Sequence, residues 1–181
     1  MSNKTNSKMS VQLMAMGGLM AALVFVATSF FKLPVSVTQG YIHLGDAFVL
    51  ISAALLGPVG VAAAAIGSML ADLLGGYFQY CLPTFIIKGA VALVALWGTS
   101  GSKPYWLQVI IFVLAEAVMV AGYFIAEWLP LGYGLAAASA AVLPNVVQGA
   151  SGVIIGAVLI PLLRKISPML GGKQSRSVKA E

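Results

Sequence analysis

Long apolar runs dominate this chain, and short clusters of proline, glycine and polar residues separate one run from the next. An α-helix of about 20 apolar residues crosses the hydrocarbon core of a bilayer, which is about 30 Å thick. The runs therefore predict membrane-spanning helices. The predicted helices cover residues 11–31, 45–56, 59–76, 84–98, 105–129 and 138–163. The fold class that follows is all-α, a polytopic membrane protein built as a six-transmembrane-helix bundle.

Two of these runs depart from the simple pattern. The run over 45–56 is short for a span, so LLGP at 55–58 is expected to break a helical hairpin whose first arm is tilted or starts below the membrane surface. The run over 11–31 could pass for a signal peptide. It is long, lacks a clear small-residue cleavage pattern and is followed by further spans, so we expect it to stay in the mature protein.

Six spans place both chain termini on one side of the membrane, and the basic residues indicate which side. The cations of the tails and of the fourth interhelical connection are Lys4, Lys8, Lys103, Arg164, Lys165, Lys173, Arg176 and Lys179. By the positive-inside rule that side is cytoplasmic. The chain then divides into a cytoplasmic N-terminal tail (1–10), a six-helix domain in the cell membrane (11–165) and a cytoplasmic C-terminal tail (166–181).

Composition agrees with this placement. Of the 181 residues, 60% are hydrophobic and 8% charged, against about 25% charged in soluble domains. The mean hydropathy is +0.99. The net charge of +5 indicates membrane topology and attraction to anionic lipid rather than a nucleic-acid surface. Cys81 is the single cysteine, which excludes an internal disulfide.

Five charged residues fall within or at the edge of predicted spans: Asp46, Asp72, Lys88, Glu116 and Glu127. A charge at the bilayer centre costs about 2.5–3.5 kcal/mol on insertion scales, so each needs a partner, water or a ligand. Lys88 could snorkel to the outer interface, or pair with Asp72 in a structural salt bridge. It could also share a polar cavity with Thr84, which lies four residues earlier on the same helix face.

Polar side chains also form stripes on the last two predicted helices. Glu116, Tyr123 and Glu127 are spaced by seven and four residues, which aligns them on one face. Asn145, Gln148 and Ser151 follow one another at successive turns of the final helix. Hydrogen bonds between helices are the alternative explanation for Asn145 and Gln148.

The outer side carries a further group of candidates. His43 is the only histidine, so a metal site of the usual kind is not expected, and a loop position is the simpler role for it. Asp46 is a candidate N-cap for the helix that follows. The tyrosines of the predicted outer side are Tyr41, Tyr77, Tyr80, Tyr123 and Tyr133. Their gathering there suits a pocket for a flat, polar heteroaromatic ligand.

Small residues mark the inner half of the first helix. Gly17 with Ala21, and Gly18 with Ala22, form two pairs at a spacing of four, which allow another helix backbone to approach closely. Packing against this chain's own helices and docking onto a partner membrane protein are both open.

Two stretches carry a family resemblance: GYIHLGDAFVLISAALLGP at 40–58 and ADLLGGYFQYCLPTFIIKGA at 71–90. With the six-helix length, they resemble the S components of energy-coupling factor (ECF) vitamin transporters, in the family that includes riboflavin, pyridoxine and hydroxymethylpyrimidine binders. The resemblance implies capture of a vitamin from outside, with the first interhelical loop as a lid. Pyridoxine or hydroxymethylpyrimidine is favoured, with riboflavin next.

The resemblance also implies partners, namely a membrane T component and two cytoplasmic ABC-type ATPases that use ATP. This chain has no GxxxxGK phosphate loop, so it should not hydrolyse ATP. As a capture subunit it is expected to hold no cofactor and to be no enzyme. The family's Ala-x-x-x-Ala docking motif maps best onto Gly18 and Ala22, although Gly17 and Ala21 are equally spaced. The expected substrate-binding residues are Tyr41, His43, Asp46, Tyr80, Thr84, Lys88, Tyr123, Glu127, Asn145 and Gln148.

Within that set we expect Lys88 to face the ligand and to be held by Asp72 or Asp46 when the site is empty. For a pyridoxine-like ligand the phenolic oxygen would lie near Lys88, and Glu127 would meet the ring nitrogen. Tyr41 or Tyr123 would stack on the ring. For an aminopyrimidine, Glu127 could engage the amidine-like edge.

Two other classes of protein compete with this interpretation. A proton-coupled secondary transporter would also use buried carboxylates, with Glu116 as the relay. An intramembrane serine protease is suggested by GASG at 149–152, with Ser151 as nucleophile and His43 as base. However, Ser151 is expected about 18 Å down its helix from the outer edge where His43 lies, so the pair should not meet.

Overall fold

The computed structural model describes residues 11–30, 32–35, 38 and 40–166. Its α-helices are α1 (Val11–Phe30), α2 (Gly45–Leu56), α3 (Pro58–Gly75), α4 (Cys81–Thr99), α5 (Tyr105–Trp128) and α6 (Leu135–Ile166). Within the described ranges, five helices are long and apolar enough to cross a membrane, all except α2. The all-α membrane class is therefore confirmed. The predicted tails lie outside the described residues except for Ile166, as do Lys4, Lys8, Lys173, Arg176 and Lys179.

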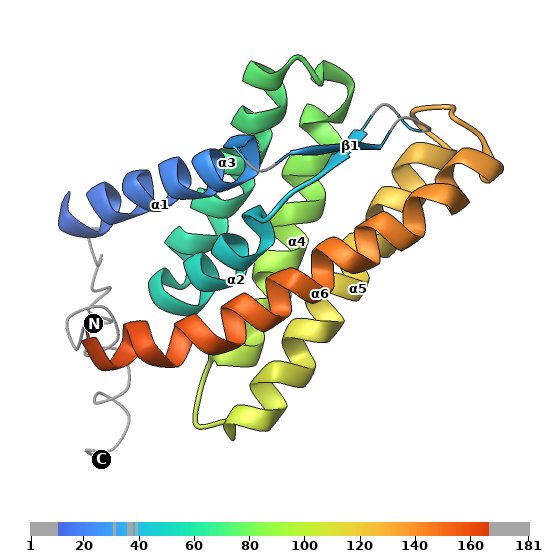
Figure 1. Ribbon diagram of the computed structural model, residues 1–181. Coiled ribbons are helices and arrows are strands. Elements are labelled where there is room, and N and C mark those ends of the chain that lie inside the picture. Colours follow the sequence, from blue (N-terminus) through green and yellow to red (C-terminus); the bar gives the residue numbers. More distant parts are fainter. Residues whose placement is uncertain (1–10, 31, 36–37, 39, 167–181) are drawn as a thin grey trace, which may run out of the picture.

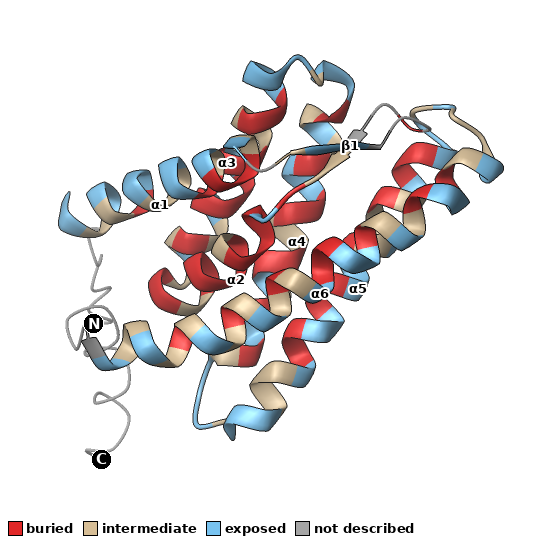
Figure 2. Cartoon of the chain, viewed as in Figure 1, coloured by how far each residue is buried: buried red, intermediate tan, exposed pale blue. Residues whose placement is uncertain are grey.

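Helix α2 has only 12 residues and is buried along nearly its whole length, as Figure 2 shows. It packs against α1, α3, α4 and α6. A helix that is apolar on all sides is stable when other helices surround it. Its short run therefore gives a central core helix, with the predicted bounds of 45–56, around which the longer helices pack.

A tight turn joins α2 to α3 at the predicted break. Gly57 has φ of +60°, a conformation that favours glycine, and Pro58 occupies the first turn of α3, where a missing N–H costs nothing. The Ser52 hydroxyl donates to the Gly60 carbonyl oxygen at 2.7 Å, which fastens the two helices beside the turn.

A β-hairpin stands between α1 and α2, where the sequence indicated only a loop. Strand β1 (Leu33–Val35) pairs antiparallel with β2 (Gly40–Ile42), with Leu33 opposite Ile42. Strands of three residues, one of them containing Pro34, are too short to produce a readable alternation of apolar and polar positions. The hairpin lies across the end of the bundle opposite to the α4–α5 connection (Figure 1).

Two helices are longer than predicted, α4 mainly at its start and α6 by three residues at each end. Helix α4 begins at Cys81 rather than 84, since Pro83 lies in its first turn, where backbone N–H groups have no partner within the helix. A 3₁₀ turn, η1 (Phe78–Tyr80), leads into it. Helix α6 continues through Pro144 and Pro161. In a membrane bundle, neighbouring helices compensate for such interruptions.

We expect Gly60→Ala to destabilise the bundle, because a Cβ atom at Gly60 would lie 1.9 Å from the Ser52 carbonyl oxygen. Helices α2 and α3 would have to separate, and overpacking of this kind costs about 1–3 kcal/mol. Thermal unfolding in detergent measures the loss. Gly18→Ala is the matched control, since no atom lies within 4 Å of its added Cβ. Equal melting temperatures for the two variants would contradict the close contact.

Candidate functional site

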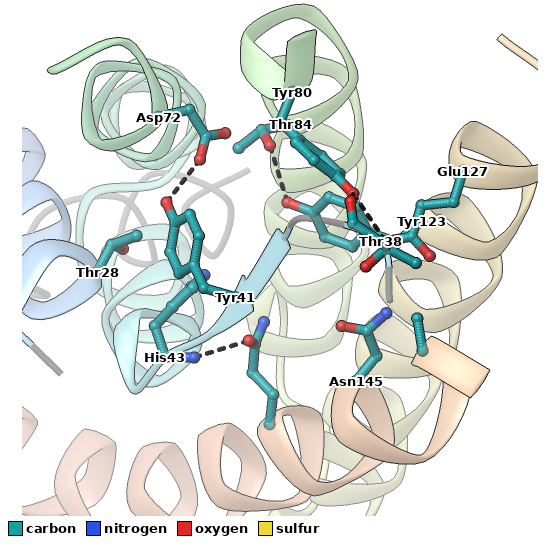
Figure 3. A pocket seen from close by; sticks show the side chains of 12 residues that line it. Thr28, Thr38, Tyr41, His43, Asp72, Tyr80, Thr84, Tyr123, Glu127 and Asn145 are labelled. Atoms are coloured by element: carbon teal, nitrogen blue, oxygen red, sulfur yellow. Dashed lines mark hydrogen bonds between the residues drawn. The ribbon is translucent and has the colours of Figure 1, made fainter. Parts of the chain in front are cut away.

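A polar pocket lies beneath the hairpin, at the end of the bundle where α1, α3, α4, α5 and α6 converge (Figure 3). Its volume is about 30 Å³, room for about two water molecules. Its lining consists of Thr28, Thr38, Tyr41, His43, Asp72, Tyr80, Thr84, Tyr123, Glu127, Ala141, Asn145 and Gln148. Among these lining residues, only Ala141 lacks a polar side-chain atom.

The hairpin is tied to one wall of the pocket through Tyr41. Its hydroxyl donates to Asp72 Oδ1 of α3 at 2.6 Å. Burial and the Asp72 charge raise the pKa of Tyr41, so the phenol keeps the proton that it donates. The Lys32 ammonium lies 4.2 Å from the centroid of the Tyr41 ring and donates to the Ala71 carbonyl oxygen at 3.3 Å. Two contacts therefore connect the hairpin to the end of α3: one from the Tyr41 hydroxyl, and one from Lys32, just before β1.

The opposite wall holds a second set of tyrosine contacts. The Tyr80 hydroxyl lies 2.7 Å from the Thr38 carbonyl oxygen and 3.1 Å from Glu127 Oε1, so two acceptors share its single proton. The hydroxyls of Thr84 and Tyr123 lie 3.0 Å apart. At this wall, hydroxyl groups therefore link α4, α5 and the connection between the two strands.

Gln148 of α6 links the pocket to the bundle core. Its Oε1 accepts the His43 backbone N–H at 2.8 Å, and its Nε2 donates to Asp46 Oδ2 at 2.7 Å. The amide is buried and satisfied on both sides, as expected of a polar side chain between helices. Movement of this side chain would break its hydrogen bonds both to the His43 backbone and to Asp46.

The prediction that Asp46 caps α2 was wrong. The N-cap residue is Leu44, without a side-chain cap bond, and Asp46 lies inside the first turn with its carboxylate in the core. His43 Nδ1 instead accepts the Gly45 N–H at 2.9 Å, which satisfies a free donor at the helix start. Burial and then the Lys88 charge lower the pKa of His43 to about 3. The imidazole is therefore neutral at physiological pH, as an accepting Nδ1 requires.

Lys88 does not snorkel. It forms a salt bridge with Asp46, and both side chains are 0% exposed. Its ammonium also lies 5.4 Å from the centroid of the Tyr123 ring. The alternative pairing with Asp72 is not made, since Asp72 accepts from Tyr41 instead. Lys88 is thus held by Asp46, one of the two carboxylates expected to do so, and lies below the pocket rather than in its lining.

Three buried lining atoms have no hydrogen-bond partner in the described part of the chain: Thr28 Oγ1, Asp72 Oδ2 and Glu127 Oε2. Figure 3 shows Asp72 and Glu127 on opposite sides of the pocket. An unsatisfied buried carboxylate oxygen is costly unless a donor reaches it. The pocket therefore suits a ligand that presents hydrogen-bond donors toward two walls.

Eight of the predicted substrate-binding residues line the pocket: Tyr41, His43, Tyr80, Thr84, Tyr123, Glu127, Asn145 and Gln148. The other two, Asp46 and Lys88, lie beneath it. Sequence reasoning missed Thr28, Thr38 and Ala141, because a single small residue in a sequence does not indicate that it lines a pocket. Asp72 did carry a signal, as a carboxylate in a span, but it was considered only as a partner of Lys88.

The two rival sites have different surroundings. The Ser151 hydroxyl donates to the Gln148 carbonyl oxygen at 2.7 Å within its own helix, and His43 Nδ1 is occupied by Gly45. The described residues therefore show no hydrogen-bonded Ser–His pair. Glu116 is buried but does not line the pocket.

The small residues of α1 face two different directions. A Cβ at Gly17 would lie 2.7 Å from Val59 Cγ1, and the Ala21 carbonyl oxygen comes close to Gly67, so this pair packs against α3. Gly18 has no atom within 4 Å of its added Cβ, and both Gly18 and Ala22 are exposed. The structure therefore leaves the pair Gly18 and Ala22 open on the surface of the bundle.

Comparison with known proteins gives a consistent family. Residues 8–165 match the family described as ECF-type riboflavin transporter, S component. An uncharacterised protein of Pyrococcus woesei is 37% identical over 149 residues, which cover 81% of this chain and 99% of that protein. The thiamine precursor transporter HmpT of Lactococcus lactis subsp. cremoris is 34% identical over 158 residues, covering 85% and 89% respectively.

We expect Lys88→Met to destabilise the protein strongly, because it leaves the Asp46 carboxylate buried without its cation. Breaking a buried pair in this way costs about 3–5 kcal/mol. Unfolding of the purified protein in detergent measures the effect, with the exposed Lys165→Met as control, expected to change stability by less than about 0.5 kcal/mol. A stability loss no larger than that of the control would argue against a structural ion pair.

Proposed function

We propose that this chain, which belongs to the family of S components of ECF-type riboflavin transporters, captures a small donor-rich heteroaromatic vitamin precursor of the hydroxymethylpyrimidine class. Members of this family are transport subunits of the membrane and not enzymes. Capture would take place from the outer side, in the pocket beneath the hairpin.

The observation that carries this choice is the pair of free carboxylate oxygens on Asp72 and Glu127. An aminopyrimidine offers an exocyclic amino group, and its protonated amidine-like edge matches a carboxylate with two parallel hydrogen bonds. The similarity to a thiamine precursor transporter supports the same class. Tyr41, Tyr80 and Tyr123 offer faces against which the ring would stack.

Pyridoxine and riboflavin fit these walls less well. The phenolic oxygen of pyridoxine was expected to meet Lys88, but that ammonium is paired with Asp46 below the pocket, and no cation lines the described walls. Riboflavin carries a larger fused ring with an apolar dimethylbenzene edge, whereas Ala141 is the single lining residue without a polar side-chain atom. Both remain the comparison ligands for any binding experiment.

Ligand entry would require the hairpin to move, because a cavity of about 30 Å³ is too small for a heteroaromatic ring. The contacts to be broken are those of Tyr41 with Asp72 and of Tyr80 with Thr38 and Glu127. The donors of the ligand would replace the tyrosine hydroxyls on the same carboxylates. Closure over the ligand would then restore a satisfied, buried polar cluster.

Delivery to the inside would require docking on a membrane T component and two ABC-type ATPases, which supply energy from ATP. The exposed pair Gly18 and Ala22 on α1 is the surface that we assign to this contact, because small residues permit close approach of another helix. Both termini would lie in the cytoplasm, on the side of the ATPases. The chain itself would hold no cofactor.

Titration of the purified chain by intrinsic tryptophan and tyrosine fluorescence tests the ligand class. We expect one-to-one binding, with hydroxymethylpyrimidine tighter than pyridoxine or riboflavin. Glu127→Gln and Asp72→Asn should each weaken binding about ten- to hundredfold, since a hydrogen bond to a charged group is worth about 1.5–3 kcal/mol. Ser68→Ala, which removes a buried polar group of α3 outside the pocket lining, is the control and should leave affinity unchanged. Tighter binding of riboflavin would overturn the choice of ligand.

Co-purification with the T component and ATPases tests docking. Gly18→Leu and Ala22→Leu should each abolish assembly while leaving ligand affinity of the isolated chain intact, because the added side chains fill the open surface. Ala117→Leu, an exposed alanine of α5, should still assemble. Normal assembly of both α1 variants would mean that the contact lies elsewhere on the chain. In a separate measurement, uptake without any ATPase would favour a proton-coupled transporter.

A further inference from the structure

Glu116 of α5 is a buried acid that the proposed function does not use. Its side chain is 4% exposed, and neither carboxylate oxygen has a hydrogen-bond partner among the described residues. It lies outside the pocket lining. A carboxyl group in this position needs an explanation, because native structures rarely leave both oxygens of a buried acid unsatisfied.

The neighbours of Glu116 come from three other helices. On α6, a Cβ at Gly149 would lie 2.9 Å from Glu116 Cβ and 3.4 Å from its Oε2, so the acid packs directly against the glycine. The charged groups that act on it are Asp46 of α2 and Lys88 of α4. Gln148 is the adjacent polar residue on α6, and its amide is already bonded to Asp46 and to the His43 backbone.

The charges in this cluster do not balance if every group is ionised. Lys88 is the single cation, whereas Asp46 and Glu116 are two acids. Asp46 receives both the Lys88 ammonium and the Gln148 amide, while Glu116 receives no donor. An ionised carboxylate buried without donors is strongly disfavoured, and such groups become neutral by taking up a proton. Of the two acids, Glu116 is therefore the one expected to carry a proton.

We propose that Glu116 is a buried proton-binding site, a neutral carboxylic acid at physiological pH that serves as the reserve counter-ion of Lys88. When Asp46 no longer holds Lys88, Glu116 releases its proton to water and pairs with the ammonium. A metal ion is not the alternative ligand, because the described residues contain no group of three or more acids, histidines or cysteines placed to hold one. This inference does not depend on which vitamin binds.

One side chain connects this site to the pocket. Gln148 lines the pocket and donates to Asp46 Oδ2, and Asp46 in turn holds Lys88. A change in the pocket that draws Gln148 away weakens the hold of Asp46 on Lys88. Release of the proton from Glu116 compensates, because it provides Lys88 with a second carboxylate, from α5.

Infrared spectroscopy of the full chain in lipid tests the protonation state directly, since a carboxylic acid has a carbonyl stretch that an ionised carboxylate lacks. At neutral pH we expect a band in the wild-type protein that disappears in Glu116→Gln. If that variant cannot be recovered, Glu116→Asp serves instead, because its shorter acid should shift the band. A spectrum unchanged by the Glu116 substitution would overturn the proposal.

The reserve role is tested by Asp46→Asn, which keeps an acceptor for Gln148 but removes the charge that holds Lys88. Glu116 should then ionise, so its carbonyl band should be lost while the glutamate remains in place. Asp72→Asn is the matched control, an equivalent change at another buried acid, and should retain the band. Persistence of the Glu116 band in Asp46→Asn would contradict the exchange of partners.

Discussion

The buried ion pair of Lys88 and Asp46 is the contact around which this bundle is organised. Charges inside a membrane are tolerated only when they are paired or hydrogen-bonded, so the pair fixes how deep and at what rotation α2 and α4 face each other. Gln148 extends it to α6 and to the backbone of His43. The short helix α2 could not hold a position in the bilayer by its length, and this network together with its apolar contacts locates it.

The pocket above the pair follows from the same constraint. Four of the chain's five acidic residues are buried in the bundle, while Lys88 is the single fully buried cation of the described ranges. Once Asp46 has taken that cation, the remaining acids need donors from elsewhere. Tyrosine hydroxyls donate to one oxygen each of Asp72 and Glu127, and the second oxygen of each carboxylate has no donor among the described residues.

The small residues of α1 lie on two sides of the helix, one packed against α3 and the other exposed. Gly17 lies against Val59, and Gly67 against the backbone of Ala21, so these small residues serve the internal contact between α1 and α3. Gly18 and Ala22, one position further along, are exposed. A rotation of one residue in a helix is about 100°, which is enough to turn equivalent small pairs toward different neighbours.

Local signals, namely apolar run length and proline or glycine breaks, were enough to predict the all-α membrane class and most of the helix boundaries. The charged residues that are buried in the described ranges were also predicted, since an ionisable residue in an apolar run is conspicuous, and so were eight of the pocket residues. Three other features could be read only from the folded bundle. Whether Lys88 meets Asp46 or Asp72, whether Gly17 or Gly18 faces outward, and how Tyr41 reaches Asp72 all depend on helix rotation and on a hairpin of three-residue strands. Those are set by packing between segments distant in the chain, which no local pattern encodes.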